Sequence, residues 1–474
     1  MSTSSDHPRN PLPPRPVQAP WPWRTVLCIG LIYAAVAQGR IAIEDSNLML
    51  TVSRSMAAGH LDTPPGPLMV LGPDGRSFCH FGLLTSLWWF PFMLGGRLLH
   101  ALGAPMDVGH CEEFVVSFAS GFVAVACLAY LAWYWREKGV PARRVRSGLW
   151  LWGLASVLFP YAKLPGSDII MGLALLAALI HFELRGDRAR HLALTGLWLG
   201  LALMARKQAQ TIVPVLGVWM AARIWIGSPE VRRMPAVAKR LGQIAAGAAG
   251  PVAIHLTYNL IRFGSPVVER YPQAEYHVPG VIEWVWRAWL LTAGLDHGFV
   301  VYNLVVVVVL AYGCAHIDRG LAWLLAALWA TQTAFLAMLP YWNGGVCFGS
   351  RFLLYLVLIA GTAWPGFVAG RHGAVRRIVF VAALVIAVGV QAVGVTVDPL
   401  AARLRYEWAK EQARNQLFGG AMETIRVLGL PGGELPPALR EVPEMSHPPL
   451  QVPDLWWCQI IRMRHELRRD PGSR

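Results

Sequence analysis

The sequence predicts an all-α integral membrane protein with about eleven transmembrane helices and with juxtamembrane helices in its first large outer loop. Of the 474 residues, 55% are hydrophobic and only 15% are charged. The apolar residues form blocks that are hydrophobic on every side and long enough to cross roughly 30 Å of hydrocarbon. The net charge of +14 lies mostly in short linkers between these blocks, as the positive-inside rule expects. This distribution argues against nucleic acid as a partner.

Twelve apolar blocks are candidate spans, and linker charge decides which of them cross. The blocks are 25–43, 81–101, 113–135, 147–163, 169–184, 192–205, 209–226, 241–262, 298–315, 320–340, 352–370 and 376–397. The linker 136–146 is strongly basic, so we expect it on the cytoplasmic side together with the N-terminal tail. Only an even number of crossings joins two cytoplasmic segments. The block 81–101, interrupted by Pro91 and two glycines, is therefore predicted to lie in the outer interface.

This topology divides the chain into three parts. Residues 1–24 are Pro-rich and are predicted to be a disordered cytoplasmic tail. Residues 25–397 form the transmembrane domain, with a first outer loop at 44–112 and a second at 263–297. Residues 398–474 form an extracytoplasmic tail or cap. Cys79 and Cys111 both fall in outer segments, and the sequence leaves open whether they form a disulfide.

Two carboxylates mark the outer face. Asp45 follows the first span directly, and Asp168 precedes a later one in "YAKLPGSDIIMG". Acids at the end of a span can simply be solvated, which is the alternative for each one taken alone. Ionisable groups this close to hydrocarbon are costly, however, and are usually functional or paired with bases.

Several basic residues share that face and suggest a cradle for an anionic headgroup. A guanidinium can bind a phosphate through two hydrogen bonds. The alternative for each residue is an ordinary interface anchor that extends to lipid headgroups. The candidates for binding a donor phosphate are Arg351, His80, Arg206, Lys163 and Arg54.

Two carboxylates facing a phosphate site suggest group transfer, with Asp45 as the catalytic base and Asp168 as its partner acid. The base would deprotonate an incoming hydroxyl or amine while the positive charges stabilise the departing phosphate. A divalent metal shared by Asp45 and Asp168 is an alternative that the sequence leaves open.

At these residues the chain resembles the GT-C class of polytopic glycosyltransferases, which includes the protein O-mannosyltransferases and the lipid A aminoarabinose transferase. The matching motifs follow in order through residues 25–365. They are "EDSNLMLTVSRSMAAGHLD", "CHFGLLTSLWWFPFMLGGRLL", "YAKLPGSD", "GLALMARKQA", "YNLIRFGSPVVERY" and "YWNGGVCFGSRFLLYLVL". One departure is Ser46, which stands where the family usually has a second acid after Asp45, so Glu44 is the remaining neighbour that could substitute.

The resemblance implies a bacterial inner-membrane glycosyltransferase that uses a polyprenyl-phosphate sugar donor. It implies Asp45 as the general base or a metal contact, in a site facing the periplasm or exterior. The acceptor is a lipid, a glycan or a protein, and we expect Tyr271 and the loop 263–297 on the acceptor side. Two alternatives from other classes remain. One is a transporter or flippase of a lipid-linked sugar, and the other is a scaffold for envelope assembly without catalysis.

Overall fold

The computed structural model describes residues 21–41, 43–66, 69–226, 234–267, 279–295, 297–339, 342, 347–370, 373–396 and 455. Tyr271, Cys458, residues 1–20 of the predicted N-terminal tail and nearly all of the predicted C-terminal tail lie outside these residues.

The described part of the chain is a helical bundle with membrane-spanning dimensions. Seven helical stretches are long and apolar enough to cross a bilayer. They are α4 (Val108–Val116) with α5 (Ala119–Glu137), α8 (Ser167–Arg185), α10 (Ala209–Ile226), α11 (Met234–Phe263), α15 (Arg319–Ala337), the stretch of η2 (Arg351–Leu353), α16 (Leu354–Ala360), η3 (Gly361–Ala363) and α17 (Trp364–Ala369), and α18 (Ala374–Thr396). Shorter apolar stretches are α1 (Trp23–Val36), α9 (Ala189–Ala205), and α14 (Leu304–Gly313) with η1 (Cys314–His316). Each coincides with a predicted span, so the prediction of a multi-pass, all-α membrane protein is confirmed.

The remaining predicted span, 147–163, is divided in two. It becomes α6 (Ala142–Leu154) and α7 (Leu158–Lys163). Side chains satisfy the backbone at the break: the Ser156 hydroxyl accepts from the Leu158 amide at 3.3 Å, and the Asn303 side chain accepts from the Val157 amide at 3.1 Å. The count of eleven spans therefore stays a prediction.

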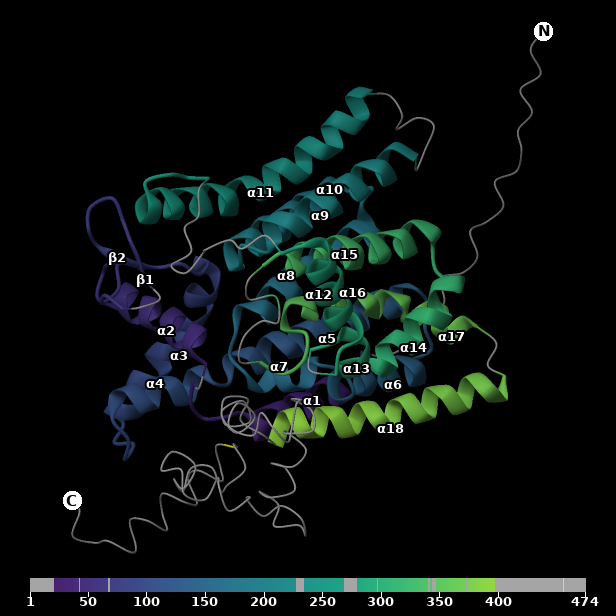
Figure 1. The fold of residues 1–474 in the computed structure, drawn as a ribbon, viewed down its shortest axis with the longest axis horizontal. Helices are drawn as coiled ribbons and strands as arrows, with labels where there is room; N and C mark the ends of the chain where they lie inside the picture. The colour runs from purple at the N-terminus through teal and green to yellow at the C-terminus, as the bar shows by residue number, and fades with distance from the viewer. Residues whose placement is uncertain are drawn as a thin grey trace, which may run out of the picture.

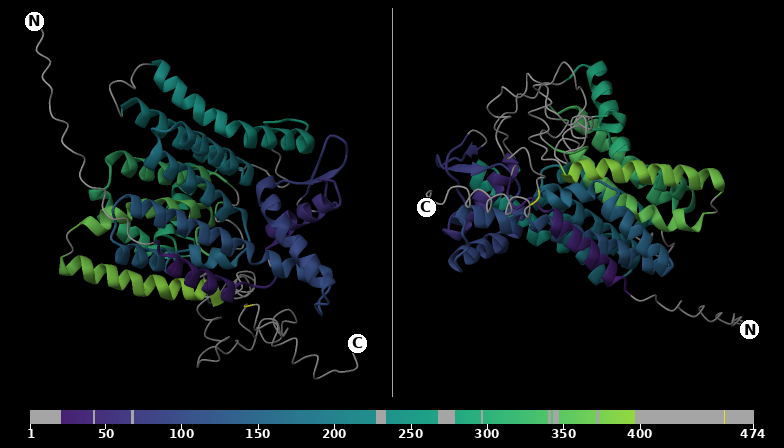
Figure 2. Two further views of the ribbon diagram at one scale, coloured as in Figure 1. Left: turned by 180° about the vertical axis from the view of Figure 1, so that it is seen from behind. Right: turned by 90° about the horizontal axis from the view of Figure 1, so that it is seen from below.

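Helix α8 forms the centre of the bundle, and α11 and α18 run along its opposite edges (Figures 1 and 2). The apolar window of α8 is 83% buried, whereas that of α11 is 22% buried and leaves a wide face for lipid. Helices α9 and α11 pack closely because small residues line their contact. A Cβ added at Gly196 would lie 1.8 Å from the Ile244 carbonyl oxygen, so only glycine fits there.

A helical cap, made of α2 (Glu44–Ala57), β1 (Met69–Leu71), β2 (Ser77–Cys79), α3 (Leu83–Ala101) and α4, gathers at one end of the bundle (Figure 1). Strands β1 and β2 form a short antiparallel hairpin that the sequence analysis did not predict. Helix α3 packs on α2 through buried serines, since the Ser53 hydroxyl donates to the Ser86 carbonyl at 2.9 Å. The predicted outer-interface segment 81–101 thus corresponds to α3, a helix of the cap.

The segment predicted to be the second large outer loop contains a further helix, α12 (Val281–Ala293), and the short α13 (Phe299–Tyr302) follows it. The Trp284 indole donates to the Ala334 carbonyl on α15 at 2.9 Å. Trp286 and Trp289 on α12 remain more than half exposed. Such amphipathic aromatics are typical of the membrane interface.

Cys79 and Cys111 are both free thiols. The Cys111 sulfur instead approaches the Met106 carbonyl oxygen at 3.7 Å. Burial raises the pKa of the Cys79 thiol to about 11, so at neutral pH it holds little of the thiolate that disulfide exchange requires. The structure therefore does not contain the Cys79–Cys111 bridge that the sequence left open.

Candidate functional site

The candidate site is organised by one guanidinium that holds two carboxylates. Arg351 Nη2 donates to Asp45 Oδ2 at 2.6 Å, and Arg351 Nε donates to Asp168 Oδ2 at 2.8 Å. The three residues are far apart in the sequence and lie on α2, α8 and η2. Arg351 is only 6% exposed, so both ion pairs lie in surroundings that screen charge weakly.

A second guanidinium completes the network on the buried side. Arg206 Nη1 donates to Asp168 Oδ2 and to the Ser167 hydroxyl, each at 2.8 Å. Arg206 ends α9 in an extended conformation, which takes its side chain away from the helix and toward the first turn of α8. The helix dipole adds to this attraction, because a carboxylate in the first turn faces the positive end of its helix. Asp168 is therefore a buried anchor for two arginines.

The two acids differ in accessibility. The side chain of Asp168 is 2% exposed, whereas that of Asp45 is 28% exposed. Burial by itself would raise the pKa of Asp45, but Arg351, Arg206 and His80 together outweigh it and hold the pKa below its ordinary value of 3.8. Asp45 is thus an ionised carboxylate at neutral pH that another molecule can reach.

The backbone around Asp45 is fixed by its neighbour. The Ser46 hydroxyl donates to the Pro165 carbonyl at 2.6 Å and is buried, which ties the start of α2 to the turn before α8. The serine that replaces the family's usual acid therefore holds Asp45 and Asp168 on adjoining segments. Glu44, on the other side of Asp45, is exposed.

The residues on both sides of His80 are held through hydrogen bonds from α11 to their backbone carbonyls. Arg262 Nη1 donates to the carbonyls of Cys79 and Phe81 at 2.8 and 2.7 Å, and Arg262 is only 1% exposed. The His80 ring packs on Phe81 with centroids 4.0 Å apart, and a protonated His80 would lower the pKa of Asp45. Arg262 lies in the motif "YNLIRFGSPVVERY", but no role was predicted for it.

Two of the predicted phosphate-binding residues have partners elsewhere. Lys163 is fully buried, and its Nζ donates to the Val395 carbonyl at 2.8 Å, which joins α7 to α18. Arg54 pairs with Glu112, which also pairs with Arg97 at 2.7 Å, so this group joins α2, α3 and α4 within the cap. These contacts indicate packing roles for Lys163 and Arg54.

The donor set at this site does not suit a divalent metal. Among the described residues, no group of three or more His, Cys, Asp or Glu side chains is arranged to hold one. The Arg351 guanidinium also lies between the two carboxylates that a shared ion would need. A metal bridging Asp45 and Asp168 would have to displace Arg351, so no step is assigned to it.

No role was predicted for Ser167 or Arg262, and Ser46 was noted only as a departure from the GT-C motif. The contacts of all three depend on hydrogen bonds between distant segments, and no spacing in the sequence signals such contacts. The buried Oδ1 of Asp168 accepts no hydrogen bond from the described residues.

The architecture defines a membrane protein with a GT-C-like fold. The structure of ArnT from Cupriavidus metallidurans in the apo state matches with a TM-score of 0.50 and 13% sequence identity, covering 84% of this chain and 72% of that one. ArnT from the same organism bound to undecaprenyl phosphate matches with a TM-score of 0.49 and 12% identity, covering 86% and 70%. No family model and no curated protein sequence matches the chain. At this level of identity the likeness to ArnT establishes the fold alone.

Proposed function

We propose that the protein is a glycosyltransferase of the bacterial inner membrane. It transfers a sugar from a polyprenyl-phosphate donor to a lipid, glycan or protein acceptor at the outer face. The observation that carries the proposal is the Arg351 bridge, which holds the accessible, ionised Asp45 beside a second guanidinium and His80. The fold and the ordered motifs of the sequence are consistent with this chemistry.

In the proposed mechanism, Asp45 is the general base. Its carboxylate removes a proton from the acceptor hydroxyl or amine as that group attacks the anomeric carbon of the sugar. The bond between the anomeric carbon and the phosphate oxygen breaks, and the polyprenyl phosphate leaves with the electron pair. A base must reach the acceptor, and Asp45 is the more exposed of the two acids.

The positive groups would stabilise the departing phosphate. Arg351 and Arg206 place two guanidinium charges beside Asp45 and Asp168, and such charges stabilise a phosphate that leaves. His80 is a third candidate because it lies close enough to lower the pKa of Asp45 when it is protonated. Asp168 serves to orient the two arginines. Tyr271 and the loop 263–297 remain proposed for the acceptor side.

The test separates transfer from transport and from scaffolding. Purified protein in proteoliposomes would receive a panel of polyprenyl-phosphate hexoses and pentoses with extracted envelope acceptors. A transferase releases free polyprenyl phosphate together with glycosylated acceptor. A flippase moves the intact donor across the bilayer without releasing the carrier, and a scaffold does neither. Either of the last two results would contradict the proposal.

A further inference from the structure

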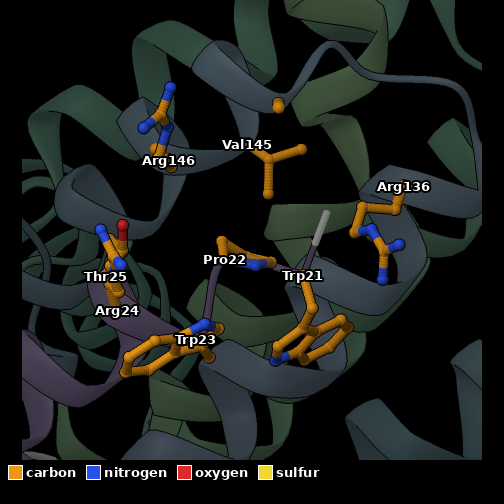
Figure 3. Close-up of a pocket in the computed structure, with 9 residues that line it drawn as sticks. Trp21, Pro22, Trp23, Arg24, Thr25, Arg136, Val145 and Arg146 are labelled. Carbon is orange, nitrogen blue, oxygen red and sulfur yellow. The ribbon is translucent and has the colours of Figure 1, made fainter. Parts of the chain in front are cut away.

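A basic pocket lies at the end of the bundle opposite the cap, where α1 and α6 begin and α5 ends. A pocket of about 340 Å³ opens there, lined by Trp21, Pro22, Trp23, Arg24, Thr25, Arg136, Ala142, Val145 and Arg146 (Figure 3). Helix α1 crosses from this pocket toward Asp45, so the pocket and the candidate active site are separate. The transferase chemistry uses none of its residues.

The charge of the pocket is positive. The nine described lining residues include three arginines and no carboxylate. Residues in the first turns of both α1 and α6 also line the pocket, so the positive ends of two helix dipoles lie beside it. Guanidiniums together with helix N-termini form an environment that favours a phosphate group.

Aromatic rings position two of the guanidiniums. Arg136 lies over the Trp21 ring at 5.1 Å, and Arg24 lies over the Trp23 ring at 5.4 Å. A guanidinium held against an aromatic ring is ordered, and its planar shape and charge suit a phosphate group. Trp23 is 55% exposed, as expected for an indole at the boundary between lipid and water.

From these features we infer that this pocket binds the phosphate headgroup of an anionic phospholipid in the leaflet opposite the cap. The positive lining supplies the attraction to phosphate, and the exposed tryptophans place the pocket at the height of the headgroups. Basic pockets between transmembrane helices are a recurrent way to bind such lipids.

The test measures binding to the full-length protein in a neutral detergent, by native mass spectrometry and by thermal shift. The probes are dioctanoyl phosphatidylglycerol, dioctanoyl phosphatidylcholine and glycerol 3-phosphate. We expect saturable binding of phosphatidylglycerol that the Arg136→Gln/Arg146→Gln double variant weakens by at least about tenfold, because charge-assisted hydrogen bonds are lost. The single variant Arg24→Gln, at an exposed position, guards against misfolding at Arg136. Arg143→Gln, which removes an exposed charge from the same helix outside the pocket, is the matched control.

Each outcome supports or overturns the assignment of the pocket to a phospholipid headgroup. Preference for phosphatidylglycerol over the other two probes supports the lipid assignment. Equally tight binding of glycerol 3-phosphate, lost in the pocket variants alone, supports a phosphate site whose ligand is soluble and overturns the lipid source. Absence of saturable binding, or an equal loss in Arg143→Gln, overturns the site and leaves only diffuse attraction between charges.

Discussion

Replacing Asp168 with Asn should destabilise the protein far more than replacing Asp45 with Asn. Asp168 is almost fully buried and pairs with two guanidiniums, whereas Asp45 is partly exposed and pairs with one. Removing the carboxylate at 168 leaves Arg206 without this acid and leaves Arg351 with Asp45 alone. Breaking a buried pair by removing one partner typically costs about 3–5 kcal/mol.

The cost at position 45 is smaller because Arg351 keeps Asp168. An asparagine there still accepts a hydrogen bond, so we expect a loss of about 1 kcal/mol or less. The two variants therefore differ in the free energy of unfolding by at least about 2 kcal/mol. Equilibrium unfolding in mixed detergent and denaturing detergent measures this difference, with Glu44→Gln as the control for loss of an exposed acid from the same turn.

A double-mutant cycle makes the reasoning sharper. If Asp168 and Arg351 are coupled, adding Arg351→Gln to Asp168→Asn should cost less than Arg351→Gln costs alone, because the carboxylate that needed the guanidinium is already gone. Near wild-type stability of Asp168→Asn, or strictly additive effects in the cycle, would refute the network as the structural basis of the site.

Three further predictions concern the surroundings of the network. Arg262→Gln removes the donor to the carbonyls on both sides of His80, so the apparent KM for a polyprenyl-phosphate donor should rise about tenfold or more while helix content by circular dichroism stays unchanged; an unchanged KM would contradict the clamp. Because the pKa of Asp45 is lowered, its ionised pair stabilises the fold above the unfolded pKa and is lost only as pH falls below 3.8, so the Asp45-dependent part of stability should be constant from pH 5 to pH 8 and decline in stronger acid. Loss of that part between pH 5 and pH 7 would mean a raised pKa. Arg54→Gln should lower the free energy of unfolding by about 1 kcal/mol or less without affecting donor binding, since its partner Glu112 keeps Arg97. Weaker donor binding in this variant would show that Arg54 contributes to the donor site.

The sequence predicted the fold well because its signals are long and physical. Apolar blocks and basic linkers indicate spans directly. The need for an even number of crossings excluded the block 81–101 as a span, and this block corresponds to α3 in the cap. The β1–β2 hairpin was missed because strands of three residues carry no periodic pattern. The break between α6 and α7 was missed because it depends on Asn303, which lies 146 residues from the amide it satisfies.

The site was harder to predict, and the reasons differ between residues. Asp45, Asp168, Arg206 and Arg351 are charges beside apolar spans, so the sequence could select them, but only the structure joins them. Lys163 was predicted to bind the donor phosphate, but its Nζ donates to the Val395 carbonyl on α18. Arg54 lies nine residues beyond Asp45 along α2, which carries it to Glu112 in the cap.

The most direct measurement of the central claim is single-turnover sugar transfer by Asp45→Asn beside Glu44→Gln in the same reconstituted membranes. If Asp45 is the base, Asp45→Asn should lower the rate at least about a hundredfold, within the range usual for a general base, while unfolding like the wild type. Glu44→Gln should keep nearly full activity. Transfer at the wild-type rate in Asp45→Asn, or an equal loss in both variants, would contradict the assignment of Asp45 and with it the proposed mechanism.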